Sequence, residues 1–226
     1  MSFPNPLFYF RNCVYLHSFR NIMNYYEFKK QYSGQGVFSL NSIERSSDNS
    51  LSSNLRRWKG EEKILRIRQG WYLFPDEAGR ADVRMAAAGK IYCPSYLSLE
   101  YVLSWYEIIP ETVLALTSVS TLKTAVFDTP IGYYSYRHVS PNLFFGYKPL
   151  QPRDGFPSLM ATPEKALLDL LYFHPEYKSD RDMENLRLDR DAMREEFDWK
   201  RFRAFLERFD NRALSQRAAV MENTYA

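Results

Sequence analysis

Periodic hydrophobic positions in the first third of the chain predict three short helices followed by a two-stranded hairpin. We expect the helices at residues 25–32, 37–45 and 50–60, and the strands at residues 63–68 and 71–74. Within the second helix, Asn41 and Glu44 have the spacing of a capping box. Three helices followed by a hairpin is the order of a winged helix-turn-helix domain, and we expect this fold for residues 23–77.

The third helix and the hairpin are each expected to have one apolar and one polar side. Leu55 and Trp58 are three residues apart and therefore share one helical face. In the first strand of the hairpin, strict alternation places Arg66 and Arg68 on the same face as Ile64. The apolar sides would form the core of the domain, and the polar sides would face outward.

From residue 78 onward the pattern predicts a larger α+β domain, residues 78–226. Strands are expected at residues 112–120, 125–129, 133–139 and 143–148, and a mostly antiparallel sheet is the simplest arrangement for them. Helices are expected at residues 80–90, from Leu99 to Pro110, after the N-cap residue Thr162, around residues 202–209 and at residues 212–225. The fold class is therefore α+β, with a winged helix-turn-helix followed by a sheet domain that ends in helices.

Composition adds a local asymmetry of charge to this picture. Residues 1–80 contain 12 Lys and Arg against 7 Asp and Glu, whereas residues 81–226 contain 18 against 20. No run of about 18 apolar residues occurs, so we expect no membrane-spanning helix. The cysteines, Cys13 and Cys93, are too far apart for a clustered zinc site or disulfide framework, which favours a reducing cytoplasm.

Residues 1–22 are expected to be an N-terminal extension outside the two domains. Arg11 and Arg20 interrupt their apolar character, and no uninterrupted apolar segment leads to a small-residue cleavage site, so we do not expect a signal peptide. The extension is either sequence upstream of a usual start at Met23 or an added arm.

The polar side of the third helix and the hairpin carry the candidate DNA-binding residues. A recognition helix in the major groove needs side chains that reach base edges, and its neighbours need cations that reach phosphates. The candidates are Ser53, Asn54, Arg56, Arg57, Lys59, Lys63, Arg66 and Arg68. A solvated helix face is the alternative, and the basic hairpin directly after the helix favours DNA binding over it.

Six short motifs then follow one another in a fixed order. They are WKG at 58–60, RQGWY at 68–72, PSYLSLE at 94–100, IPE at 109–111, YRH at 136–138 and TPEKALLD at 162–169. This ordered set resembles the AbiEi family of antitoxins, which are transcriptional regulators of type IV toxin–antitoxin systems in phage defence. The similarity covers roughly residues 25–210, is loose after about residue 175, and excludes residues 1–22.

The resemblance implies an autorepressor that binds double-stranded DNA at inverted repeats in its own promoter. It also implies an antitoxin that counteracts a nucleotidyltransferase-type toxin encoded beside it. In this family the antitoxin acts without forming a stable complex with the toxin. The resemblance implies neither enzymatic activity nor a cofactor. In the second domain, Lys123, Arg137 and Lys148 are the basic residues that we expect to meet an anionic partner. A solvated sheet edge explains these three residues equally well.

Two other functions are compatible with the sequence. A plain winged-helix transcription factor would use the second domain to bind a small ligand or to dimerise. A metal-dependent nuclease would combine Asp128, Glu164 and Lys165, but Glu164 is already explained as a first-turn acid of the helix after Thr162. The histidines have no metal-ligand spacing, and the chain lacks the Gly-Ser start of a nucleotidyltransferase. We therefore expect no metal site and no catalytic residue.

Overall fold

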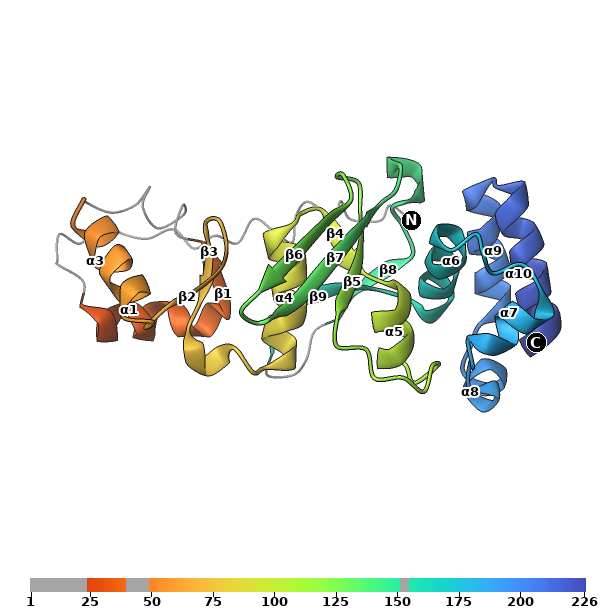
Figure 1. Ribbon diagram of the computed structural model, residues 1–226, viewed down its shortest axis with the longest axis horizontal. Helices are drawn as coiled ribbons and strands as arrows, with labels where there is room; N and C mark the ends of the chain where they lie inside the picture. Colours follow the sequence, from red (N-terminus) through yellow and green to blue (C-terminus); the bar gives the residue numbers. More distant parts are fainter. Residues whose placement is uncertain (1–23, 40–48, 151–154) are drawn as a thin grey trace, which may run out of the picture. The chain divides into compact units, whose positions relative to one another are not determined.

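The computed structural model describes residues 24–39, 49–150 and 155–226 (Figure 1). The chain divides into two compact units, Met1–Glu77 and Ala78–Ala226. This division falls at the domain boundary expected from the sequence, whereas residues 1–22 lie outside the described ranges. Among the described residues, no helix combines the length and the apolar character needed to cross a membrane.

The first unit combines helices with a small antiparallel sheet. Its elements are α1 (Tyr25–Tyr32), η2 (Ser33–Gln35), β1 (Val37–Ser39), α3 (Asn49–Gly60), β2 (Leu65–Arg68), β3 (Trp71–Leu73) and η3 (Pro75–Glu77). The strands pair in the order β1-β3-β2. Helix α1 begins at a capping box in which Asn24 accepts from the backbone of Glu27 and Glu27 accepts from the backbone of Asn24.

An aromatic core holds α3 against α1 and the sheet. Trp58 is only 1% exposed and lies 4.9 Å from Phe28 between ring centroids. Phe38 and Phe74 belong to the same buried cluster, and Leu55 completes the α3 side. The expected apolar face of the third helix is thus confirmed at Leu55 and Trp58, because both side chains are buried in this core.

The expected second helix at residues 37–45 is wrong at its start. Residues Val37–Ser39 form strand β1, in which Val37 lies opposite Leu73 and Phe38 opposite Tyr72. Branched and aromatic side chains pack well across strand pairs, and this tertiary pairing outweighs the helical pattern. The Asn41–Glu44 capping box lies outside the described residues.

The strict alternation expected for the hairpin is also wrong. Ile64 is 1% exposed and belongs to the core cluster, so it does not share an outward face with the arginines. The register of β2 shifts so that Arg66 lies opposite Tyr72 and Arg68 opposite Trp71. Consecutive residues of a strand point to opposite faces, so the shift places Arg66 and Arg68 on opposite faces of the sheet.

The second unit is built on a mixed sheet with the strand order β6-β7-β5-β4-β9-β8. The strands are β4 (Ser95–Leu97), β5 (Leu116–Ser120), β6 (Ala125–Thr129), β7 (Gly132–His138), β8 (Tyr147–Leu150) and β9 (Ser158–Ala161). The pairs β4–β9 and β5–β7 are parallel, and the other neighbours are antiparallel. The α+β class with a mostly antiparallel sheet is therefore confirmed.

Helices pack on this sheet and continue past its β8–β9 end. They are α4 (Ala81–Ile91), α5 (Leu99–Trp105), the short turn η4 (Pro141–Leu143), α6 (Pro163–Phe173), α7 (Asp180–Asn185), α8 (Arg190–Glu195), α9 (Trp199–Phe209) and α10 (Arg212–Tyr225). Helix α4 contacts β4, β5 and β9, and α5 contacts β5 and α6. Helices α9 and α10 pack against α6, and α10 also contacts α7 and α8, as the blue end of the chain in Figure 1 shows.

Several expected boundaries in this unit need correction. The strand expected at 112–120 begins only at Leu116, and the strand expected at 143–148 is a short helical turn ending at Leu143 followed by β8 from Tyr147. Strands β4 and β9 and helices α7 and α8 were not expected. Each has at most six residues, which is too short for a hydrophobic period to repeat.

Candidate functional site

The outward face of α3 carries polar and basic side chains opposite the aromatic core. Ser53, Arg56, Arg57 and Lys59 are exposed, and Asn54 is half-buried. The burial of Trp58 and Leu55 fixes which way these side chains point, because helical residues three or four apart share a face. Of the α3 candidates, Ser53, Arg56, Arg57 and Lys59 therefore face solvent, whereas Asn54 is partly covered.

Glu61 lies between two of the expected DNA-binding cations. Its Oε2 atom is 2.7 Å from Nζ of Lys63, and its Oε1 atom is 3.7 Å from Nε of Arg57. The hydrogen bond from Lys63 lowers the pKa of the Glu61 carboxyl. Sequence reasoning missed this acid, although its position four residues after Arg57 is the spacing of a helical ion pair.

Lys63, which lies between α3 and β2, also contacts Tyr25 of α1. The Tyr25 hydroxyl donates to the Lys63 carbonyl at 3.1 Å, and the Lys63 ammonium lies 5.4 Å from the centre of the Tyr25 ring. Arg66 is exposed on β2, whereas Arg68 is half-buried on the opposite face of the sheet. The structure therefore brings Arg57 and Lys63 together through Glu61, and it separates Arg66 from Arg68.

The segment that contains α3 and the β2–β3 hairpin has a positive net charge. Residues 49–73 contain six Lys or Arg and two Asp or Glu, so the balance is six minus two, or +4. Most of the basic excess of the first 80 residues therefore lies on α3 and the β2–β3 hairpin. A local positive charge of this kind attracts a polyanion at low ionic strength.

The three basic candidates of the second unit do not form one patch. Lys123 lies in the turn before β6, Arg137 is half-buried on β7 with its guanidinium 5.2 Å from the Phe173 ring centre, and Lys148 is exposed on the edge strand β8. Strands β7 and β8 are four strand spacings apart in the sheet order. At about 4.8 Å a spacing, Arg137 and Lys148 are separated by roughly 19 Å across the sheet.

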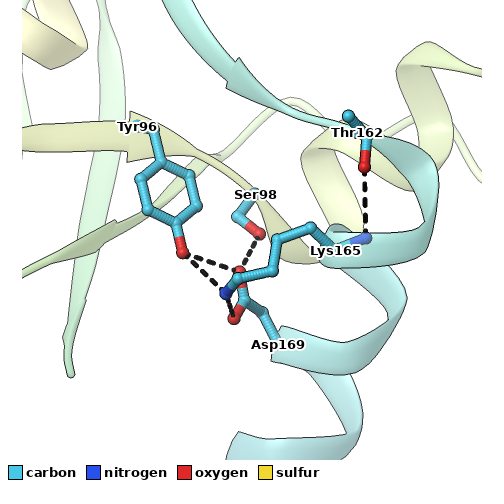
Figure 2. Close-up of polar contacts among 5 residues, drawn as sticks. All are labelled: Tyr96, Ser98, Thr162, Lys165 and Asp169. Atoms are coloured by element: carbon cyan, nitrogen blue, oxygen red, sulfur yellow. Dashed lines mark hydrogen bonds and ion pairs between the residues drawn. The ribbon is translucent and has the colours of Figure 1, made fainter. Parts of the chain in front are cut away.

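A buried polar cluster connects β4 to α6 (Figure 2). The Lys165 ammonium donates to the Tyr96 hydroxyl at 2.8 Å and pairs with the Asp169 carboxylate. The same carboxylate accepts from the Ser98 hydroxyl at 2.7 Å and from the Tyr96 hydroxyl at 3.1 Å. All four side chains belong to residues that are at most 1% exposed.

The sequence positions this cluster through the first turns of α6. The Thr162 side chain accepts from the backbone N–H of Lys165, which confirms Thr162 as the N-cap residue, and Pro163 occupies the first helical position. Lys165 and Asp169 are then one turn apart on the same face. The residues of α6 from Glu164 to Leu171 are all buried.

Burial shifts the ionisation of both members of the pair toward their neutral forms. It lowers the pKa of the Lys165 ammonium and raises the pKa of the Asp169 carboxyl, while the attraction between the two opposes both shifts. Burial also raises the pKa of the Tyr96 hydroxyl well above its usual value. Because no member has appreciable exposed surface, the cluster holds α6 on the sheet and is not placed to meet a substrate.

The structure does not bring Asp128 together with Glu164 and Lys165, the residues of the nuclease alternative. Asp128 is exposed on β6, at one end of the sheet order, while Glu164 and Lys165 follow β9, the fifth strand in that order. Within residues 24–39, 49–150 and 155–226, no group of three His, Cys, Asp or Glu side chains could hold a metal ion.

Comparison with protein-family models gives no match for the chain, and comparison with curated proteins gives none either. The function must therefore be argued from the residues and their arrangement.

Proposed function

We propose that this protein is a DNA-binding transcriptional repressor whose first unit is a winged helix-turn-helix. The observation that carries the proposal is the outward face of α3, with Ser53, Arg56 and Arg57 opposite a buried aromatic core, directly followed by the basic β2–β3 hairpin. An exposed helix beside a two-stranded wing is the arrangement that such domains use on DNA.

In this proposal α3 lies in the major groove and the hairpin lies along the phosphate backbone. Ser53, Asn54 and Arg56 are assigned to base edges, where hydroxyl, amide and guanidinium groups distinguish base pairs. Arg57, Lys59, Lys63 and Arg66 are assigned to phosphates, which position the protein without reading sequence. Arg68 is expected to contribute less to DNA affinity, because the register shift turns it to the other face of the sheet.

We further propose that the second unit is the antitoxin half of the molecule. The resemblance to the AbiEi family supports this assignment, with a nucleotidyltransferase-type toxin as the functional partner and the promoter DNA of the same operon as the ligand of the first unit. Lys123 and Arg137 remain candidates for the anionic partner, whereas Lys148 lies at the far side of the sheet. The compact second unit, Ala78–Ala226, supports a separation of the two activities.

The experiment uses the full chain in cells that carry a promoter reporter and an inducible copy of the neighbouring toxin. The variant Arg56→Ala/Arg57→Ala/Arg66→Ala is expected to lose repression and to keep growth rescue. A matched control, Arg181→Ala/Arg194→Ala/Arg212→Ala, removes three exposed arginines of the second unit and should keep repression. Full repression by the first variant, at matched protein levels, would contradict the proposal.

A plain transcription factor with a ligand-binding second unit is the second candidate. One observation favours it, namely a cavity within the second unit that contains a buried carboxylate. The two candidates differ in the rescue assay, because only an antitoxin protects cells when the toxin is induced.

A further inference from the structure

One edge of the second unit's sheet is a regular strand that is open to pairing. Strand β6 is the last in the strand order, with β7 as its neighbour (Figure 1). All five of its residues pair with β7 in an unbroken register. Within the part of the chain that the structure describes, no strand pairs with its outer edge. An edge of this kind is a template for pairing with another strand, because it presents backbone N–H and C=O groups.

The opposite edge of the sheet carries residues that oppose such pairing. Strand β8 contains Pro149, which has no backbone N–H, and the exposed Lys148. Proline and lysine are residues with which natural sheets protect an edge. Strand β6 contains neither, and its Val126 and Phe127 are of the branched and aromatic types that favour strands. The sheet is therefore protected at β8 and open at β6.

Apolar side chains are exposed beside the open edge. Val126 is 52% exposed on β6. Tyr133 of β7 lies opposite Asp128, which places it on the same face as Val126, and it is 45% exposed. Contact with another chain along this edge would remove part of this apolar surface from water, which favours association.

The charges at the two ends of β6 match a second copy of the same strand. In an antiparallel pairing centred on Val126, Thr124 lies opposite Asp128 of the second copy. Thr124 is held beside β7, because its hydroxyl accepts from the backbone N–H of His138 at 3.2 Å. Lys123 precedes Thr124, so its Cα atom would lie within about 9 Å of the Cα atom of that Asp128. Lys123 and Asp128 are both exposed and opposite in charge, and two-fold symmetry forms this ion pair twice.

Like charges stay apart in the same pairing. The two Asp128 carboxylates lie on opposite sides of the axis, about 14 Å apart along the strands, since a strand rises about 3.4 Å per residue. This distance exceeds the Debye length of about 8 Å at physiological salt, so the repulsion between them is largely screened. The charge pattern of β6 is therefore complementary to itself.

We propose that two copies of this chain associate through β6, by antiparallel pairing of the two strands about a two-fold axis at Val126. The two sheets then form one continuous sheet, with Val126 of each copy against its counterpart. The interface is small, so the association is weak and depends on protein concentration. It involves the second unit alone and does not depend on DNA binding by the first unit.

The test is sedimentation equilibrium of the full chain without DNA. A monomer–dimer equilibrium is expected, with a dissociation constant below about 100 µM. A chain that stays monomeric up to about 300 µM would overturn the proposal.

A lysine at the axis should disrupt the dimer. Val126→Lys places two ammonium groups directly opposite each other and should weaken dimerisation at least about tenfold. Leu114→Lys is the matched control, because Leu114 is 70% exposed and lies outside β6, and it should leave dimerisation unchanged. Circular dichroism checks that both variants are folded. Unchanged dimerisation in Val126→Lys, or an equal loss in Leu114→Lys, would place the association on another surface and contradict the proposal.

Charge reversal tests the register and uses only exposed residues, so it does not depend on how Val126→Lys folds. Asp128→Lys brings two lysines together at each end of the interface and should weaken dimerisation at least about threefold. Lys123→Asp/Asp128→Lys restores opposite charges and should return the dissociation constant to within about twofold of the natural value. A double variant that dimerises no better than Asp128→Lys would contradict the pairing centred on Val126.

Discussion

The ammonium of Lys165 and the carboxylate of Asp169 form an ion pair one turn apart on α6, and neither side chain has exposed surface. Removal of one partner from a buried pair leaves the other charge without compensation, which costs about 3–5 kcal/mol. We predict that Lys165→Met lowers the free energy of unfolding of the second unit by this amount, as measured by urea denaturation.

A double variant separates the charge effect from a packing effect. In Lys165→Met/Asp169→Asn, the amide can still accept from Ser98, and no charge is left buried, so this variant should be more stable than Lys165→Met alone. Lys178→Met removes an exposed lysine and should change stability by no more than about 0.5 kcal/mol. If the loss of unfolding free energy in the double variant equals the sum of the losses in Lys165→Met and Asp169→Asn, the two residues are not energetically coupled.

Trp58 should be essential for the fold of the first unit. Its ring packs against Phe28 and is 1% exposed, so Trp58→Ala creates a large cavity and should cost about 3–5 kcal/mol. A small domain with a total stability of order 5 kcal/mol would largely unfold, and DNA binding would disappear with the fold. A variant that keeps its circular dichroism signal yet loses DNA affinity would make Trp58 a DNA contact instead.

Glu61 should weaken DNA binding in the natural protein. Its carboxylate pairs with Lys63 and lies near Arg57, so Glu61→Gln releases both cations for phosphates. We predict a rise in affinity of roughly three- to tenfold at low salt, measured by fluorescence anisotropy, and a smaller rise at high salt. Glu195→Gln removes the same charge from the second unit and should leave the affinity unchanged.

The two arginines of β2, Arg66 and Arg68, should contribute unequally to DNA affinity. Arg66→Ala should reduce affinity for all DNA sequences by a similar factor, because a phosphate contact carries no sequence information. Arg68→Ala should have a smaller effect, since the register shift turns Arg68 to the opposite face. Arg56→Ala on α3 should instead change which sequence is preferred. Titrations against a set of operator variants measure all three, and equal losses for Arg66→Ala and Arg68→Ala would contradict the assigned faces.

Elements with a repeated hydrophobic period could be predicted from the sequence. Helices α6 and α10 and strands β6 and β7 are long enough for several periods, and the burial of Trp58 followed from the stripe on α3. Strands β1, β4 and β9 have only three or four residues, so no period is established within them.

The buried polar cluster around Lys165 and Asp169 was harder to predict, because the residues that form it are distant in the sequence. The spacing of Lys165 and Asp169 indicates a helical ion pair, but Tyr96 and Ser98 are more than 70 residues away from Asp169. The register shift in β2 likewise depends on how β3 pairs with it, which alternation within one strand does not reveal.

The most direct test of the central claim is the salt dependence of binding to the DNA upstream of the protein's own gene. The logarithm of the association constant is measured against the logarithm of salt concentration, with scrambled DNA of equal length as the control. Each phosphate neutralised by a residue such as Arg57, Lys63 or Arg66 contributes a slope of about −0.9, so the line should fall steeply. Upstream DNA should also bind at least about a thousandfold more tightly than scrambled DNA. Affinity that stays flat from low to moderate salt, or that is equal for the two DNAs, would contradict the account.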